Sequence, residues 1–364
     1  GPDLWTVFRN GGPSFIIPVA LLIVLLVRGY TPTYAAGYAI VACIAASWLT
    51  PNRMGVGRIV EALELGARNM IMTAILLCGV GLIVNVITTA GVGNTFSLMI
   101  AAWSQGNLLI ALVLVALASL VLGMGLPVTA AYIVLGTLSA PALYQLILQS
   151  QLADILAAGQ LPETAKAIFM LAVPDKLAAL SAPMPLAEAH DMIAALPVES
   201  LSLLYDQAFQ PEVLAVALLS AHMIIFWLSQ DSNVTPPVCL AAFTGAAIAE
   251  SPPMKTGFAA WKVAKGLYFV PLLFAYTPFL SGDWPQMLYI FFFAMFGLWA
   301  VAAAIEGYWE NRMNIVERLA TLAVGAALMW PAPHWVNFTA FAGFVALFAW
   351  NLRKRARTER SATD

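Results

Sequence analysis

The chain is a series of apolar runs of membrane-spanning character, separated by short segments that contain Gly, Pro or charged residues. Such runs lie at residues 15–27, 34–49, 213–228, 263–280 and 288–305. A helix needs about 20 predominantly apolar residues to cross a bilayer core. Because 61% of the 364 residues are hydrophobic and only 10% are charged, the chain cannot cover a water-facing surface. We therefore predict an all-α, polytopic membrane protein.

Composition excludes several classes of function. A net charge of −2 with no basic stripe excludes nucleic-acid binding. Cys43, Cys78 and Cys239 are isolated in apolar stretches without CxxC spacing, so we predict neither disulfides nor a metal centre. HExxH, GxSxG and complete nucleotide-binding loops are absent from the sequence. We therefore expect a protein that is not an enzyme and has no organic cofactor.

Changes in hydrophobicity and in the content of charged, Gly and Pro residues predict how the chain is divided into segments. The segments, in order, are two transmembrane spans (1–52), an amphipathic helix (53–69), a hairpin and a first broken helix (70–149), a polar extramembrane insertion (150–211), a second broken helix and the following span (212–280), C-terminal transmembrane spans (281–352) and a basic tail (353–364).

The region before the first broken helix has two interpretations. Polar residues recur every three to five positions from Arg53 to Arg68, which is typical of a helix lying along the membrane interface. Residues 70–89 are apolar, and the next apolar piece, residues 96–103, is too short to span. Together they form either a re-entrant hairpin, which protein or water must surround, or one span followed by a short interfacial helix. Periodicity favours neither.

Positive charges predict the orientation in the membrane. Cytoplasmic loops are enriched in Lys and Arg, so the basic tail, together with Lys255, Lys262 and Lys265, is expected on the cytoplasmic side. Residues 150–211, which contain seven acidic residues and no Arg, would then lie outside.

Two segments are interrupted by proline in a similar way. Pro127 begins the string Pro-Val-Thr-Ala-Ala-Tyr and follows Gly123 and Gly125, whereas Pro237 begins Pro-Val-Cys-Leu-Ala-Ala-Phe and follows a polar run. Interrupted apolar segments at corresponding positions are the best sequence indication of a transporter's binding site. The candidate ion- and substrate-binding residues are Gly123, Gly125, Pro127, Thr129, Ser229, Asp231, Ser232, Asn233, Thr235, Pro236 and Pro237.

The chemistry of an interrupted helix suits two kinds of ligand. Unwinding at a proline frees carbonyl oxygens, which are costly at membrane depth unless something satisfies them. A Na⁺ ion can do so, because hard cations prefer oxygen ligands. The side chains that could supplement these carbonyls are Thr129, Ser232, Asn233 and Thr235. The free N-terminus of each following half-helix favours an anionic substrate.

A plainer interpretation remains open at this point. Proline kinks are tolerated in membrane helices when neighbouring groups satisfy the freed backbone. Asp231 distinguishes the two interpretations, because an ionisable residue at membrane depth is expensive and usually functional. If the preceding helix ends at the membrane surface, however, Asp231 is only a solvated cap.

The same residues carry a resemblance to a known family. The string Leu-Gly-Met-Gly-Leu-Pro-Val-Thr-Ala-Ala-Tyr-Ile (122–133), with Thr-Pro-Pro-Val (235–238) and Pro-Met-Lys-Thr-Gly (253–257), resembles the large permease subunit of tripartite ATP-independent periplasmic (TRAP) transporters. Residues 64–69 and 306–308 are similar to the fused permeases that work with TAXI-type binding proteins. The similarity runs from about residue 15 to the C-terminus.

This resemblance implies a fold and a mechanism. The family is expected to form an elevator-type secondary transporter with two inverted halves in the bacterial inner membrane. It couples Na⁺ to the import of organic anions delivered by a periplasmic binding protein. The chain would correspond to the C-terminal half, with residues 53–68 as an arm helix. Its expected partners are a TAXI-type binding protein, the N-terminal half, a small four-helix domain and membrane lipid. The resemblance also implies that the hairpin near residues 70–103 opens to the outside of the membrane. This conflicts with the orientation predicted from the basic tail, so the orientation of the chain in the membrane stays open.

Other functional classes remain as alternatives. The chain could belong to an ATP-driven or proton-coupled transporter, to a channel, or to an intramembrane enzyme. The sequence offers little for an enzyme, because His190, His222 and His334 are far apart along the chain, and His222 is better interpreted as lining a helix interface.

Overall fold

The protein is all-α. The computed structural model of the chain describes residues 3–51, 53–172, 180, 182–237 and 239–361. Within these ranges the only strand-like pairing is an isolated bridge between Tyr308 and Arg312. Seven helical segments of this part are long and apolar enough to cross a membrane. The predicted all-α, polytopic membrane fold is thereby confirmed. The chain divides into two compact units, Gly1–Gly79 and Val80–Asp364, which we describe separately.

The first unit contains a helical hairpin. Helices α1 (Leu4–Val27) and α2 (Pro32–Ser47) pack against each other. Their connection is short because Gly29 adopts a left-handed conformation, with φ of 84°, and Pro32 occupies the first turn of α2. The Thr31 hydroxyl accepts a hydrogen bond from the Tyr34 amide at 3.4 Å and caps α2. These two helices correspond in sequence to the two expected N-terminal spans.

Helix α3 (Val56–Thr89) crosses the boundary between the two units and differs from the expected segmentation. We expected an amphipathic helix to end near residue 69 and an apolar hairpin to begin at residue 70. The structure instead has one helix through this point. No proline occurs from residue 56 to residue 89, and the glycine nearest to the expected boundary, Gly66, is tolerated inside a helix, so nothing in the backbone interrupts the helix. The polar half also carries a helix-compatible ion pair, Glu64 to Arg68, at 2.8 Å.

In the second unit, α4 (Val92–Ser104) and α5 (Leu108–Gly123) pack against the long helix α6 (Val128–Ala157). The approach of α4 to α6 is close because Gly93 has no side chain, and a Cβ there would lie 3.1 Å from the Thr137 carbonyl oxygen. The Ser97 hydroxyl donates to the Leu138 carbonyl at 2.8 Å. Helix α4 therefore packs directly on the backbone of α6 and donates a side-chain hydrogen bond to it.

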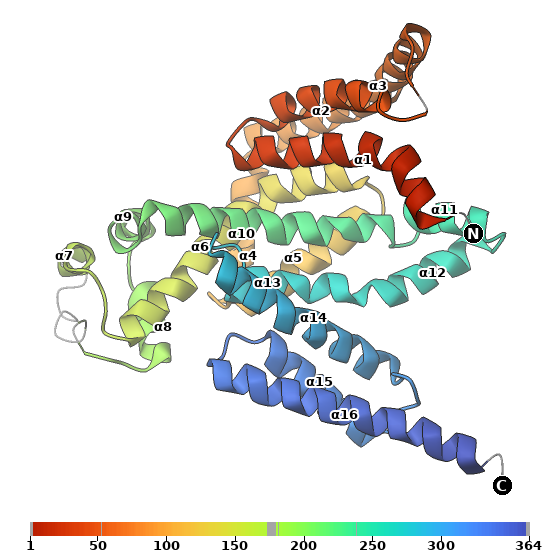
Figure 1. Cartoon of the computed structure of the whole chain (residues 1–364). Coiled ribbons are helices and arrows are strands. Elements are labelled where there is room, and N and C mark those ends of the chain that lie inside the picture. Colours follow the sequence, from red (N-terminus) through yellow and green to blue (C-terminus); the bar gives the residue numbers. More distant parts are fainter. Residues whose placement is uncertain (1–2, 52, 173–179, 181, 238, 362–364) are drawn as a thin grey trace. The chain divides into compact units, whose positions relative to one another are not determined.

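The polar insertion is a group of short helices at the C-terminal end of α6 (Figure 1). They are α7 (Glu163–Ala172), α8 (Leu186–Ala194) and α9 (Val198–Ala208). Residues 173–179 and 181 of the predicted insertion lie outside the described residues. The short helices bury apolar side chains such as Phe169, Ile193 and Leu204, which join the same core as α6. This burial explains how a segment with many charges remains folded.

Helix α10 (Pro211–Ser229) packs along α6 and leads through the short 3-10 helix η2 (Gln230–Asn233) to α11 (Leu240–Ile248). We expected the next span to begin at Val263. It begins at Pro253, and comprises α12 (Pro253–Val263), the 3-10 helix η3 (Ala264–Tyr268) and α13 (Val270–Tyr276). Pro253 can start α12 early because proline fits the first helical turn.

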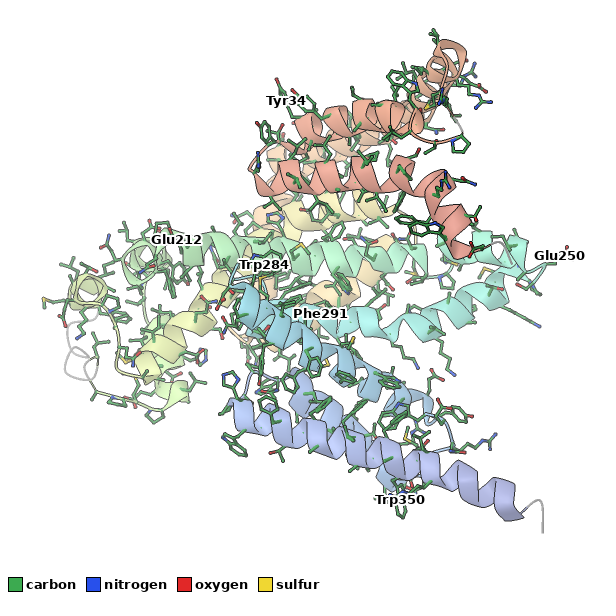
Figure 2. The ribbon with its side chains drawn as sticks, in the orientation of Figure 1. Tyr34, Glu212, Glu250, Trp284, Phe291 and Trp350 are labelled. Atoms are coloured by element: carbon green, nitrogen blue, oxygen red, sulfur yellow. The ribbon has the colours of Figure 1, made fainter. Side chains whose placement is uncertain are left out.

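Helices α14 (Trp284–Glu306), α15 (Ile315–Met329) and α16 (His334–Ser361) lie side by side (Figure 1). Helix α16 continues into the expected basic tail, of which residues 362–364 and the side chains from 354 onward lie outside the described part. These helices expose large apolar side chains, among them the aromatic residues Trp284, Phe291 and Trp350, which are labelled in Figure 2. These side chains are 67%, 55% and 54% exposed. Lipid is the solvent that suits such a surface.

Two glycines set the spacing of α14 and α15. A Cβ on Gly297 would lie 3.0 Å from the Gly325 carbonyl oxygen, and a Cβ on Gly325 would lie 3.0 Å from the Gly297 carbonyl oxygen. The helix backbones therefore touch at this crossing, as small residues allow in membrane helix pairs.

We expect Gly325→Leu to destabilise the protein by about 1–3 kcal/mol, because the added side chain forces the two backbones apart. The measurement is the apparent melting temperature of the purified protein in detergent. Gly37→Leu is the matched control, because no atom lies within 4 Å of a Cβ at Gly37. Equal melting temperatures for the two variants would contradict this account of the crossing.

Candidate functional site at two helix breaks

The first predicted break is present between α5 and α6. Helix α5 ends at Gly123 and α6 begins at Val128, so four residues separate two helices of one apolar stretch. Pro127 adopts an extended conformation, with φ of −61° and ψ of 155°. Its ring removes the amide that would have continued the helix. Thr129 lies in the first turn of α6 and its side chain is exposed.

The second predicted break is present between α10 and α11. After Ser229 the α-helix changes to the 3-10 helix η2, and regular α-helix resumes only at Leu240. The amides of Val234 and Thr235 both donate to the Asp231 carbonyl, at 3.0 and 2.9 Å. The Pro236–Pro237 peptide bond is cis. Val238, which the internal repeat aligns with Val128, lies outside the described residues.

The two breaks touch each other. Gly123, the last residue of α5, packs on the backbone of Ser232 in η2. A Cβ at Gly123 would lie 3.2 Å from the Ser232 nitrogen and 3.3 Å from its Cα. Because both of these atoms belong to the backbone, no side-chain movement could make room for a larger residue. The sequence repeat therefore marks two places that meet in three dimensions.

Asp231 is at the centre of the second break and is buried, with 1% of its surface exposed. It is therefore not a solvated cap. Its Oδ1 accepts a hydrogen bond from the Tyr268 hydroxyl at 2.7 Å. Its Oδ2 is also buried and has no hydrogen-bond partner among the described residues. A carboxylate in this environment needs a further donor or a cation.

Thr235 supplies a second buried side-chain oxygen without a hydrogen-bond partner among the described residues. Its side chain is 4% exposed, and its Oγ1 has no hydrogen-bond partner within the described part of the chain. Asp231 and Thr235 belong to one helical turn, which the hydrogen bond from the Thr235 amide to the Asp231 carbonyl closes. Both unsatisfied oxygens thus come from a single short segment of the second break.

The other predicted residues have different surroundings. The Ser229 hydroxyl donates to the Ile225 carbonyl at 2.7 Å, and the Ser232 hydroxyl donates to the Ser229 carbonyl at 3.0 Å. The Asn233 amide donates to Gln230 Oε1 at 3.4 Å, which leaves its own carbonyl oxygen as an acceptor. Hydroxyl oxygens that donate still have lone pairs available for a cation.

Sequence reasoning missed two residues that contact this site. Tyr268, in η3, holds Asp231, and the Trp261 indole of α12 donates to the Tyr268 hydroxyl at 3.3 Å. Both are aromatic residues in an apolar span, where they resemble interface anchors. The one available signal was that a tyrosine in such a span needs a partner for its hydroxyl.

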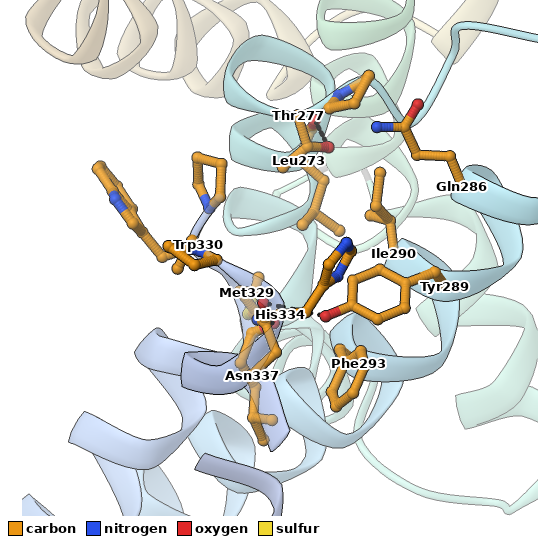
Figure 3. Close-up of a pocket in the computed structure, with 15 residues that line it drawn as sticks. Leu273, Thr277, Gln286, Tyr289, Ile290, Phe293, Met329, Trp330, His334 and Asn337 are labelled. Carbon is orange, nitrogen blue, oxygen red and sulfur yellow. Dashed lines mark hydrogen bonds between the residues drawn. The ribbon is translucent and has the colours of Figure 1, made fainter. Parts of the chain in front are cut away.

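Polar side chains elsewhere serve helix contacts. The Tyr132 hydroxyl lies 3.2 Å from His222 Nδ1, between α6 and α10, which places His222 at a helix interface. At the junction of α13 with α14–α16, Tyr289, His334 and Asn337 line a cavity of about 360 Å³ (Figure 3). The Tyr289 hydroxyl donates to Asn337 Oδ1 at 3.3 Å, and the Asn337 amide donates to two carbonyls of α15. These contacts join the N-terminal end of α16 to its neighbours.

Comparison with known proteins gives the chain a family. A family model described as "Tripartite ATP-independent periplasmic transporter, DctM component" matches residues 1–280. No curated protein and no solved structure matches the chain. The match includes both helix breaks, Asp231 and Tyr268, and helices α14–α16 follow it. The chain belongs to the DctM family of tripartite ATP-independent periplasmic transporters.

Proposed function

We propose that the chain is the permease subunit of a sodium-coupled symporter that imports a small organic anion. The observation that carries this proposal is the pair of buried oxygens, Asp231 Oδ2 and Thr235 Oγ1, which have no hydrogen-bond partner in the described structure. They lie where two interrupted helices touch. A monovalent cation is the ligand that best compensates a buried carboxylate beside a hydroxyl.

The coordination shell has further candidates. Carbonyl oxygens at both breaks are candidates, because the last carbonyls of a helix lack their regular intrahelical partners. Those of Leu122 and Asp231 already accept amides of the breaks, and a carbonyl oxygen has a second lone pair. Ser232 and Asn233 add a hydroxyl and an amide oxygen beside Asp231. Tyr268 donates to Oδ1 and so directs Oδ2 away from itself. Thr129, which is exposed at the start of α6, is assigned to the substrate side of the site or to its mouth.

The anionic substrate is assigned to the helix N-terminus that follows the first break. Amides in the first turn of α6 have no helical acceptors, and the helix dipole places partial positive charge there. Gly125 allows a ligand to approach, because no atom lies within 4 Å of a Cβ at that position. A cation bound at Asp231 and Ser232 would lower the cost of bringing an anion to this place, which is the physical basis of coupling.

The family match supports a proposal for the partners and the location. We propose that a periplasmic binding protein, of the TAXI type, delivers the substrate, and that the chain works with a further permease half and a small four-helix domain in a bacterial inner membrane. An elevator movement of the helix breaks across the membrane is the mechanism we assign to it. The DctM match supports the transporter assignment over an enzyme.

The test is uptake into proteoliposomes that contain the complete permease together with its binding protein. Radiolabelled succinate, 2-oxoglutarate and glutamate serve as probes. We expect uptake of at least one of them to require an inward Na⁺ gradient and the binding protein, and to need no ATP. Uptake that follows a proton gradient in choline buffer, or that depends on ATP, would contradict the proposal.

A further inference from the structure

A second feature of the molecule is lined by α12, η3 and α14 and contains none of the residues of the two helix breaks. It is a cavity of about 160 Å³ with Lys262 and Lys265 on one side and Glu306 on the other. Phe269, Leu298 and Ile305 line its apolar part. A space with cationic groups beside apolar walls suits an amphiphilic anion.

The charges at this cavity are unequal. The Lys262 ammonium lies 3.1 Å from Glu306 Oε2, and the Lys265 ammonium lies 3.5 Å from Glu306 Oε1. Two ammonium groups therefore share one carboxylate, which leaves a positive charge in excess. No acidic residue occurs in the sequence from 253 to 268, so α12 and η3 add no compensating charge. The Arg318 guanidinium donates to the carbonyls of Ala304 and Ile305, near the end of α14, and does not line the cavity.

The ion pairs are accessible to a competitor. The side chains of Lys262, Lys265 and Glu306 are 62%, 36% and 42% exposed. Exposed ion pairs contribute little to stability because water screens them. An incoming anion can therefore take the place of Glu306 at small cost.

The occupant is indicated by what surrounds the cavity. Val263, at its edge, is 82% exposed, and Trp261 is 39% exposed. In a chain of this class such apolar surface faces lipid. Lys262 and Lys265 lie within the candidate span Pro253–Tyr276, but they pair with Glu306, the last residue of α14, which places them at the end of that span. Lysines at the end of a membrane span attract anionic lipids, which are enriched in the cytoplasmic leaflet. Of the two orientations given above, the one from the positive-inside rule places these lysines on the cytoplasmic side.

We propose that this cavity binds the headgroup of an anionic phospholipid. Lys262 and Lys265 contact the phosphate, Glu306 is displaced from them, and the first carbons of an acyl chain lie against Phe269, Leu298 and Ile305. The lipid joins η3, in the family-matched part of the chain, to α14, which follows it. Because η3 also carries Tyr268, the lipid stabilises the segment that holds Asp231.

The test is native mass spectrometry of the complete permease in detergent, titrated with phosphatidylglycerol or with phosphatidylcholine of identical acyl chains. We expect tighter binding of phosphatidylglycerol. The double variant Lys262→Gln/Lys265→Gln should weaken its binding about 25-fold, which is about fivefold for each lysine. Lys255→Gln, an exposed lysine of α12 that does not line the cavity, is the matched control and should bind normally.

Two further measurements separate lipid binding from misfolding of the variants and from binding of a free phosphate. Glu306→Gln removes the competing carboxylate and should strengthen phosphatidylglycerol binding, a gain that a misfolded variant would not show. Glycerol phosphate, the headgroup chemistry without acyl chains, should fail to displace the lipid. Equal binding by the wild type and the double variant, weaker binding by Glu306→Gln, or full displacement by glycerol phosphate would overturn the proposal.

Discussion

Asp231→Asn is expected to raise the Na⁺ concentration for half-maximal uptake by about a hundredfold or more. Asparagine keeps the shape of the side chain and an acceptor for the Tyr268 hydroxyl, but it removes the charge that the cation compensates. Removing one partner of a buried charge pair costs about 3–5 kcal/mol, and each 1.4 kcal/mol corresponds to about tenfold in affinity. The measurement is the Na⁺ dependence of the initial uptake rate in proteoliposomes.

Asp191→Asn is the matched control for this experiment. It makes the same chemical change at an exposed position of α8, so we expect a normal Na⁺ dependence. Thr235→Val should give an intermediate shift, because it removes a neutral ligand and leaves the carboxylate in place. An unchanged Na⁺ dependence in Asp231→Asn, with normal folding and expression, would exclude this carboxylate as a cation ligand.

The second large effect is expected for Gly123→Val. Valine would place a branched side chain where the Ser232 nitrogen and Cα already lie 3.2 and 3.3 Å from a Cβ. The two breaks would have to separate, so the carbonyls of α5 would no longer lie beside η2. We expect uptake to fall by about a hundredfold or more, since an ångström of misplacement in a binding site can cost that much.

Gly245→Val is the control for the glycine substitution. Gly245 lies in α11 and is exposed, and no atom lies within 4 Å of a Cβ there. Both variants are first compared by size-exclusion chromatography, because overpacking also lowers stability by about 1–3 kcal/mol. If folded Gly123→Val protein transports as well as Gly245→Val protein, contact between the breaks is not required for transport.

Local chemistry made the interrupted helices predictable. Pro127 and Pro237 each remove a backbone donor, and the glycines or polar residues before them weaken the helix further, so the positions of both breaks could be predicted from the sequence. The all-α membrane fold followed in the same way from the length of the apolar runs. These features depend on residues that are near each other in the chain.

Contacts between distant residues could not be predicted in this way. Tyr268 lies 37 positions from Asp231, and no periodicity relates the two. The packing of Gly123 on Ser232 depends on how α5 aligns with α10 and η2, which neither sequence segment specifies alone. Helix α3 shows the reverse problem, because a change from amphipathic to apolar texture suggested a boundary where the backbone has no reason to break.

Equilibrium binding of ²²Na⁺ to the purified complete permease tests the central claim most directly, because it needs no knowledge of the substrate. We predict saturable binding to the wild type and to Asp191→Asn, weaker binding to Thr235→Val, and no measurable binding to Asp231→Asn. Saturable binding of equal affinity in the wild type and Asp231→Asn would contradict a cation site at the second helix break.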